Sequence, residues 1–131
     1  MSRLLLIETA SEVCSAAIAV DGQVVSIQED LQCASHTAVL TLQIEACCRM
    51  AGISLKALDA VGISQGPGAY TALRVGASVA KGICYALDKP LIAVSTLEAL
   101  AWASRREIAD EAGNHYFVPM LDARQIGRAH V

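Results

Sequence analysis

Charged side chains are scarce in this sequence of 131 residues. They make up 18% of it, whereas hydrophobic residues make up 54%; an ordinary soluble domain has about 25% charged residues. The net charge is −3 and there is no run of basic residues, which argues against extensive contact with nucleic acid by this chain alone. The surplus of apolar side chains needs a membrane, a partner or a second lobe to cover it.

Long apolar runs are also missing. The best candidate for the ~20-residue run of a membrane-spanning helix, residues 69–87, is interrupted by Arg74, Ser78 and Lys81. The apolar run near the N-terminus stops at Glu8, which is too short for a signal peptide. None of the five cysteines forms a Cys-x-x-Cys motif, so we expect reduced thiols that pack as small hydrophobes in a cytoplasmic protein.

Strand and helix patterns alternate along most of the chain. Asp21-Gly22 predicts a hairpin turn between two strands, and Ser35 and Gly52 are typical of the two ends of a helix. Three antiparallel strands followed by alternating helices and strands predict a mixed α/β layer fold. The expected strands are 3–9, 14–20, 23–30, 60–64, 91–94 and 116–121, and the expected helices are 35–52, 70–87 and 96 to about 112.

The first two helices carry more apolar surface than one buried face requires. Each has a second apolar stripe, and the small residues Ala72, Gly76 and Ala80 would let another helix approach closely. The second stripes could pack the two helices together, face a second lobe, or bind a partner. We expect the partner interface to include Val39, Leu42, Ala46, Met50, Ala72, Val75, Gly76, Val79 and Ile83.

Two loops resemble anion-binding loops but lack their defining residues. The loop Gly66-Pro67-Gly68 joins a strand to a helix, yet no Gly-Lys-Ser/Thr follows and the spacing does not fit a dinucleotide fingerprint. We interpret it as a tight strand-to-helix turn. A second loop, with Glu8, Thr9 and Ser11, is similar to the phosphate loop of actin-like ATPases and sugar kinases, where the acid is usually Asp and a Gly follows. We interpret it as a vestigial, structural loop.

His36 stands in the first turn of an expected helix, and residue 40, one turn later, is Leu. A single histidine is no metal site, because such a site needs at least three protein ligands. No Gly-x-Ser-x-Gly elbow and no Cys–His pairing stands out, so the sequence gives little support to a hydrolase. We expect no catalytic residue and no metal ligand in this chain.

Taken together, these segments resemble the TsaB (YeaZ) family, from Leu4 to Arg124. The most specific stretch runs from the Gly-Pro-Gly loop through Arg74 to Gly76. The residues that carry the resemblance are 7–15, 35–37, 66–76, 94–97 and 119–124.

The resemblance implies an actin-like ATPase (ribonuclease H-like) lobe and a role in making threonylcarbamoyladenosine in tRNA. It implies a non-catalytic scaffold that pairs with the catalytic subunit TsaD, is joined by the ATPase TsaE, forms a homodimer when alone and meets tRNA only indirectly. TsaD's metal-binding histidines are absent from TsaB, which fits Leu40. No cofactor is expected in this chain itself, and ATP or ADP only in the assembled complex.

The resemblance also divides the chain. Residues 1–114 are expected to form the first lobe, 115–124 the first strand of a truncated second lobe, and 125–131 a non-native tail. Two alternative functions remain open: an actin-like nucleotide-binding phosphotransferase or ATPase that uses Glu8 and Thr9, and a peptidase-like cell-growth factor.

Overall fold

The computed structural model describes residues 1–108 and 113–121 and contains one five-stranded mixed sheet. Its strand order is β3-β2-β1-β4-β5. The strands are β1 (Arg3–Glu8), β2 (Cys14–Val20), β3 (Gln23–Asp30), β4 (Ala60–Gly66) and β5 (Leu91–Ser95), and the helices are α1 (His36–Ala51), the short 3₁₀ helix η1 (Leu55–Ala57), α2 (Tyr70–Leu87) and α3 (Thr96–Glu107).

The first three strands form the antiparallel half of the sheet, as the sequence predicted. The turn between β2 and β3 has left-handed backbone angles at both central residues, with φ of 49° at Asp21 and 79° at Gly22. Asp and Gly tolerate these angles, and such a turn matches the twist of the strands that it joins. The Asp-Gly pair therefore sets the register of this hairpin.

The other half of the sheet is parallel. β4 pairs with β1, and β5 pairs with β4, both in parallel orientation. The carboxyl ends of β1, β4 and β5 therefore lie at the same edge of the sheet, together with the loop from β1 to β2. Ligands of open α/β sheets bind at such an edge, so it is the first place to look for a site.

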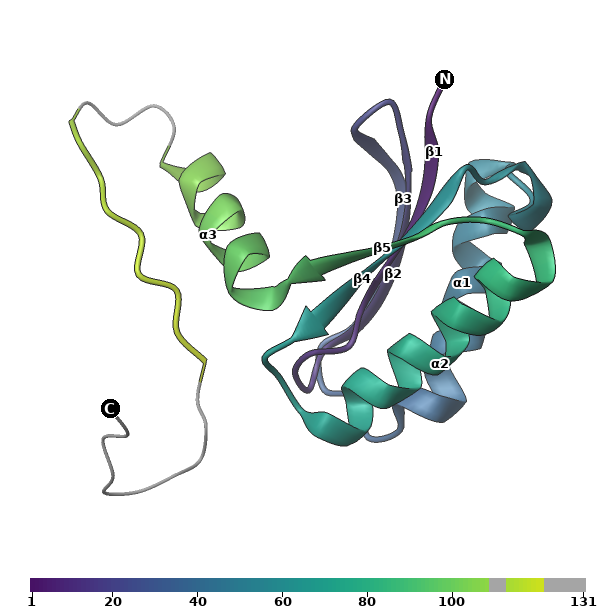
Figure 1. Ribbon diagram of the computed structural model, residues 1–131, viewed down its shortest axis with the longest axis horizontal. Helices are drawn as coiled ribbons and strands as arrows, with labels where there is room; N and C mark the ends of the chain where they lie inside the picture. The colour runs from purple at the N-terminus through teal and green to yellow at the C-terminus, as the bar shows by residue number, and fades with distance from the viewer. Residues whose placement is uncertain (109–112, 122–131) are drawn as a thin grey trace.

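One face of the sheet is covered by α1 and α2, while α3 lies beyond the end of β5 on the other side (Figure 1). The core lies between the sheet and the first two helices. It is built from apolar strand residues and from Leu40, Ile44 and Cys47 of α1 and Ala80 and Cys84 of α2.

The ends of α1 follow the predicted capping signals. The Ser35 hydroxyl accepts a hydrogen bond of 3.4 Å from the Ala38 amide, and Gly52 ends the helix with a left-handed φ of 66°. We expect Ser35→Ala to lower the free energy of unfolding by about 1 kcal/mol. Ser54 precedes η1 without a side-chain capping bond, so Ser54→Ala is the matched control. Equal losses in the two variants, measured by urea unfolding, would contradict this role for Ser35.

The C-terminal part differs from the expectation. Residues 114–121 form no strand, and their apolar side chains Val118 and Met120 are about three-quarters exposed, at 75% and 76%. An alternating pattern predicts a strand only where another strand can pair with it, and none of the described strands pairs with this segment. The described part of α3 ends at Glu107 rather than near 112; residues 109–112, 122–124 and the tail 125–131 lie outside the described residues.

Within residues 1–108 and 113–121, no helix is both long enough and apolar enough to cross a membrane.

Candidate functional site

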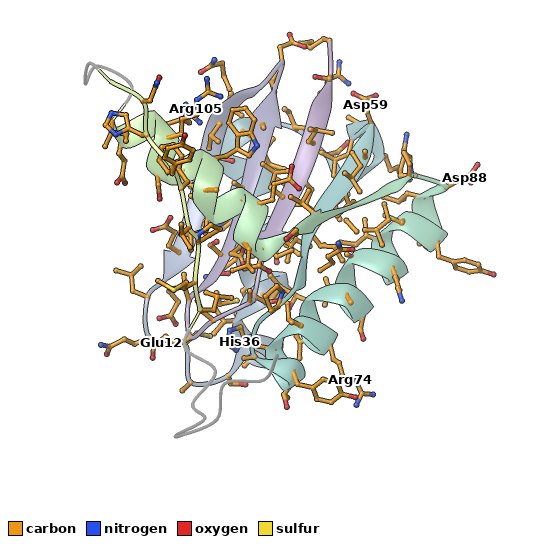
Figure 2. The ribbon with its side chains drawn as sticks, turned by 60° about the vertical axis from the view of Figure 1, so that its left-hand side comes forward. Glu12, His36, Asp59, Arg74, Asp88 and Arg105 are labelled. Atoms are coloured by element: carbon orange, nitrogen blue, oxygen red, sulfur yellow. The ribbon has the colours of Figure 1, made fainter. Side chains whose placement is uncertain are left out.

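The residues singled out in the sequence meet at the carboxyl edge of the parallel strands. Glu8 ends β1, Gly66 ends β4, and the loop that follows each strand touches the other. Cys14 begins β2 beside the first of these loops. Figure 2 shows Glu12 and His36 together at this end of the sheet, with Asp59 at the opposite end.

Glu8 is held by its own neighbours. One carboxylate oxygen accepts the Ala10 amide at 2.7 Å, and the other accepts the Ser64 hydroxyl from β4. Ser11 likewise uses its hydroxyl within the loop, because it accepts the Val13 amide at 3.3 Å. These bonds fix the shape of the loop and engage two of its amide groups.

The two loops are packed against each other without room for a side chain. A Cβ atom on Gly68 would lie 2.4 Å from the Ala10 carbonyl oxygen, and the Ala69 amide donates to that same oxygen at 2.7 Å. A Cβ atom on Gly76, in the second turn of α2, would lie 2.4 Å from the Thr9 hydroxyl oxygen. Gly68 thus allows the two loops to approach closely, and Gly76 leaves room for the Thr9 side chain.

This geometry does not suit a phosphate. A phosphate loop offers free amide groups and positive charge, whereas here two amides are already engaged and a carboxylate occupies the strand end. Thr9 is only 2% exposed and packs against α2. The arrangement favours the interpretation of Glu8, Thr9 and Ser11 as a structural loop, and of Gly66, Pro67 and Gly68 as a tight turn.

A second group of chemically capable side chains lies beside this loop. The Cys14 and Cys33 sulfur atoms and one imidazole nitrogen of His36 all lie within 4.8 Å of one another. They come from the start of β2, the β3–α1 connection and the first turn of α1. No Cys–His pairing stood out in the sequence, because Cys14 is far from Cys33 and His36 along the chain and only the hairpin brings the three together.

The thiol of Cys14 is not activated as a nucleophile. Burial, followed by the nearby Cys33 and Asp30, raises the pKa of Cys14 to about 12. Burial also raises the pKa of Cys47, Cys48 and Cys84. Reactive cysteines have lowered pKa values, so none of these four thiols is an activated nucleophile. All five cysteines are free thiols.

The expected partner interface is only partly on the surface. Ala72 and Gly76 are buried against the rest of the chain, so their assignment to an interface was wrong. With Ala80 and Cys84 they form the buried line of α2, and their small size lets the helix approach the sheet and Thr9 rather than another helix. Val39, Ala46, Val75, Val79 and Ile83 are partly buried.

Two side chains of the expected interface are well exposed, Leu42 at 65% and Met50 at 64%. Met50 does not form one stripe with the α2 residues. The Met50 sulfur lies 3.0 Å from the Gln28 side-chain nitrogen, which places it on the β3 side of α1. Val75 and Val79 instead line a shallow groove of about 360 Å³, together with Thr37, Thr71, Arg74 and Ser78. This groove joins the first turn of α1 to the outer side of α2.

Comparison with known proteins decides the family. The TsaD family model, described as tRNA N6-adenosine threonylcarbamoyltransferase, matches residues 30–126. The tRNA threonylcarbamoyladenosine biosynthesis protein TsaB of Haemophilus influenzae is 36% identical over 101 residues, which are 77% of this chain and 42% of that relative. The chain belongs to the TsaB (YeaZ) family of TsaD-like proteins.

Other relatives agree with this assignment. The structure of YeaZ from Pseudomonas aeruginosa matches with a TM-score of 0.78 and 34% identity, over 83% of this chain and 51% of that one. A tRNA N6-adenosine threonylcarbamoyltransferase of Clostridium kluyveri is 33% identical over 112 residues, which cover 73% of this chain and 33% of that relative. The expected actin-like, ribonuclease H-like lobe is thereby confirmed. This TsaB-family chain spans about half the length, or less, of the proteins that it matches.

Proposed function

We propose that this chain is the N-terminal lobe of a non-catalytic scaffold in tRNA threonylcarbamoyladenosine biosynthesis. It binds a TsaD-type catalytic subunit through the outer face of α1 and α2. The observation that carries the proposal is the combination of an exposed apolar side chain, Leu42, with a groove whose floor includes Val75 and Val79. Apolar surface of this kind marks protein interfaces.

The choice of partner rests on the relationship between the two families. The TsaD family model covers α1 and α2 of this chain, so a TsaD-type protein carries a corresponding pair of helices. Two related helix pairs can pack face to face around an approximate two-fold axis. A second copy of the chain presents the same surface, so we expect a homodimer when the catalytic partner is absent.

Catalysis by the chain alone has little support. The carboxylate of Glu8 and the closed contact between its loop and Gly68 leave no cradle for a nucleotide phosphate. The raised pKa of Cys14 disfavours a cysteine peptidase. ATP or ADP then binds only in the assembled complex, which includes a TsaE-like ATPase. Contact with tRNA comes through the partner, because the net charge of this chain is −3. Free thiols suit a cytoplasmic protein.

The proposal is tested by binding of the full chain to the TsaD-type protein of the same organism. Leu42→Asp places a charge on the exposed apolar position, and Ser78→Arg fills the groove from an exposed helical site. We expect each to weaken binding at least about tenfold, because an unpaired charge buried in an interface costs several kcal/mol. The measurement is isothermal titration calorimetry.

Val24→Asp is the matched control, since Val24 is 56% exposed on β3, away from the groove. It should bind within about twofold of the unchanged chain, because an exposed substitution outside an interface changes little. Undiminished binding by both Leu42→Asp and Ser78→Arg would contradict the interface. Tight binding of ATP and Mg²⁺ with turnover by the chain alone would favour the phosphotransferase alternative instead.

A further inference from the structure

The three side chains beside the β1–β2 loop form a set of donors that suits a transition metal. Two thiols and an imidazole are the groups that Zn²⁺ prefers. On a tetrahedral Zn²⁺ such atoms lie roughly 3.5–3.8 Å apart, and here the three atoms already lie within 4.8 Å of one another. Small movements of the three side chains would therefore bring all three atoms to coordination distance from one ion.

The backbone holds these residues in place. The Cys33 amide donates to the Glu12 carbonyl oxygen at 2.9 Å, and His36 Nε2 lies 3.1 Å from the Ser11 carbonyl oxygen. Cys14 is fixed in β2, where its own carbonyl oxygen accepts the Gln43 side-chain amide at 2.9 Å. Backbone carbonyl groups of the β1–β2 loop thus hold both the β3–α1 connection and the first turn of α1 by hydrogen bonds.

The contact between His36 and Ser11 also has the form that metal-binding histidines use. A ligating imidazole usually donates its other N–H to a carbonyl or carboxylate, which fixes the tautomer and the ring orientation. When Nε2 donates to Ser11, the lone pair of the ring is on Nδ1. Nδ1 is then the nitrogen that can bind an ion, and the Ser11 carbonyl oxygen is the partner that orients the ring.

Charge and access are also suitable. Two thiolates balance the charge of one Zn²⁺, so the site as a whole would be neutral once the ion is bound. Cys33 and His36 are partly exposed, which gives an ion a way in. Three protein ligands leave a fourth position for water.

We propose that Cys14, Cys33 and His36 form a Zn²⁺ site that joins the β1–β2 loop to the start of α1. This site is separate from the docking surface proposed above. Its ligands come from one end of the sheet and were not apparent in the sequence, where a single histidine and scattered cysteines gave no local motif apart from Cys33-x-x-His36.

The test uses the reduced, metal-free chain and ZnCl₂ in competition with a chromophoric zinc chelator, followed by Co²⁺ substitution. We expect one equivalent of Zn²⁺ to bind, and a thiolate-to-Co²⁺ charge-transfer band to appear. Cys33→Ser and His36→Gln, both at partly exposed positions, should weaken Zn²⁺ binding by about a hundredfold or more, because a ligand contributes more than its outer-shell partner, whose loss costs about 10–100-fold. Circular dichroism checks that both variants fold.

Cys48→Ser is the matched control, because Cys48 is a partly buried thiol on α1 outside the cluster; its affinity for Zn²⁺ should stay within about twofold of the unchanged chain. The proposal is overturned if the reduced chain takes up no stoichiometric Zn²⁺. It is equally overturned if Cys33→Ser and His36→Gln bind the ion as tightly as Cys48→Ser does, or if Co²⁺ binds without a thiolate band.

Discussion

Gly76→Ala should destabilise the protein by about 1–3 kcal/mol, although alanine is the better helix former. A Cβ atom at this position would lie 2.4 Å from the Thr9 hydroxyl oxygen, 3.3 Å from its methyl carbon and 3.4 Å from its Cβ. Relief requires Thr9, which is only 2% exposed, to change rotamer in a packed site, or α2 to move away from the end of β1.

Gly82→Ala provides the matched control in the same helix. Among the described residues, no heavy atom lies within 4 Å of a Cβ built on Gly82, so alanine there adds helix propensity without a contact. We expect it to raise the free energy of unfolding by about 0.5–1 kcal/mol. The two glycine variants should therefore change stability in opposite directions in urea unfolding followed by circular dichroism. Equal stability of the two variants would rule out the close contact of α2 with Thr9.

The same helix shows how far the sequence predicts the structure. Both ends of α2 were predicted, because Gly66-Pro67-Gly68 interrupts the pattern before it and Pro90 follows it. Which stripe is buried was not predicted. The sequence predicted two apolar stripes on this helix, whereas the helix buries one line of small residues, Ala72, Gly76, Ala80 and Cys84. Residue size, which sets how closely two elements approach, decided this rather than hydrophobicity.

The candidate sites show the limit of local patterns. The structural character of the loop at Glu8 could be inferred from its missing glycine, and the contacts of Glu8 and Gly68 support that inference. The grouping of Cys14 with Cys33 and His36 could not be inferred from the sequence, because it depends on the register of the β2–β3 hairpin. Only Cys33 and His36 are close in sequence, and a pair of ligands alone is too weak a signal for a metal site.

The second large effect concerns Leu40, one turn after His36. Leu40 is fully buried against the sheet, whereas Leu42, two residues later, is 65% exposed. We expect Leu40→Ala to lower the free energy of unfolding by about 2–5 kcal/mol through loss of buried surface and the cavity that remains. Leu42→Ala should change it by no more than about 0.5 kcal/mol. Chemical denaturation of both variants at one protein concentration measures the difference.

The variants of Leu40 and Leu42 also distinguish an effect on stability from an effect on partner binding. If Leu42 belongs to the partner surface, Leu42→Ala weakens binding of the TsaD-type protein while stability is unchanged. If Leu42→Ala leaves both stability and binding unchanged, Leu42 does not belong to that surface. If Leu40→Ala is as stable as the unchanged chain, the core described above is contradicted.

A buried Leu40 also means that a second histidine one turn from His36 would face the core. The metal site proposed at His36 therefore takes its other ligands from Cys14 and Cys33 rather than from the next turn of α1.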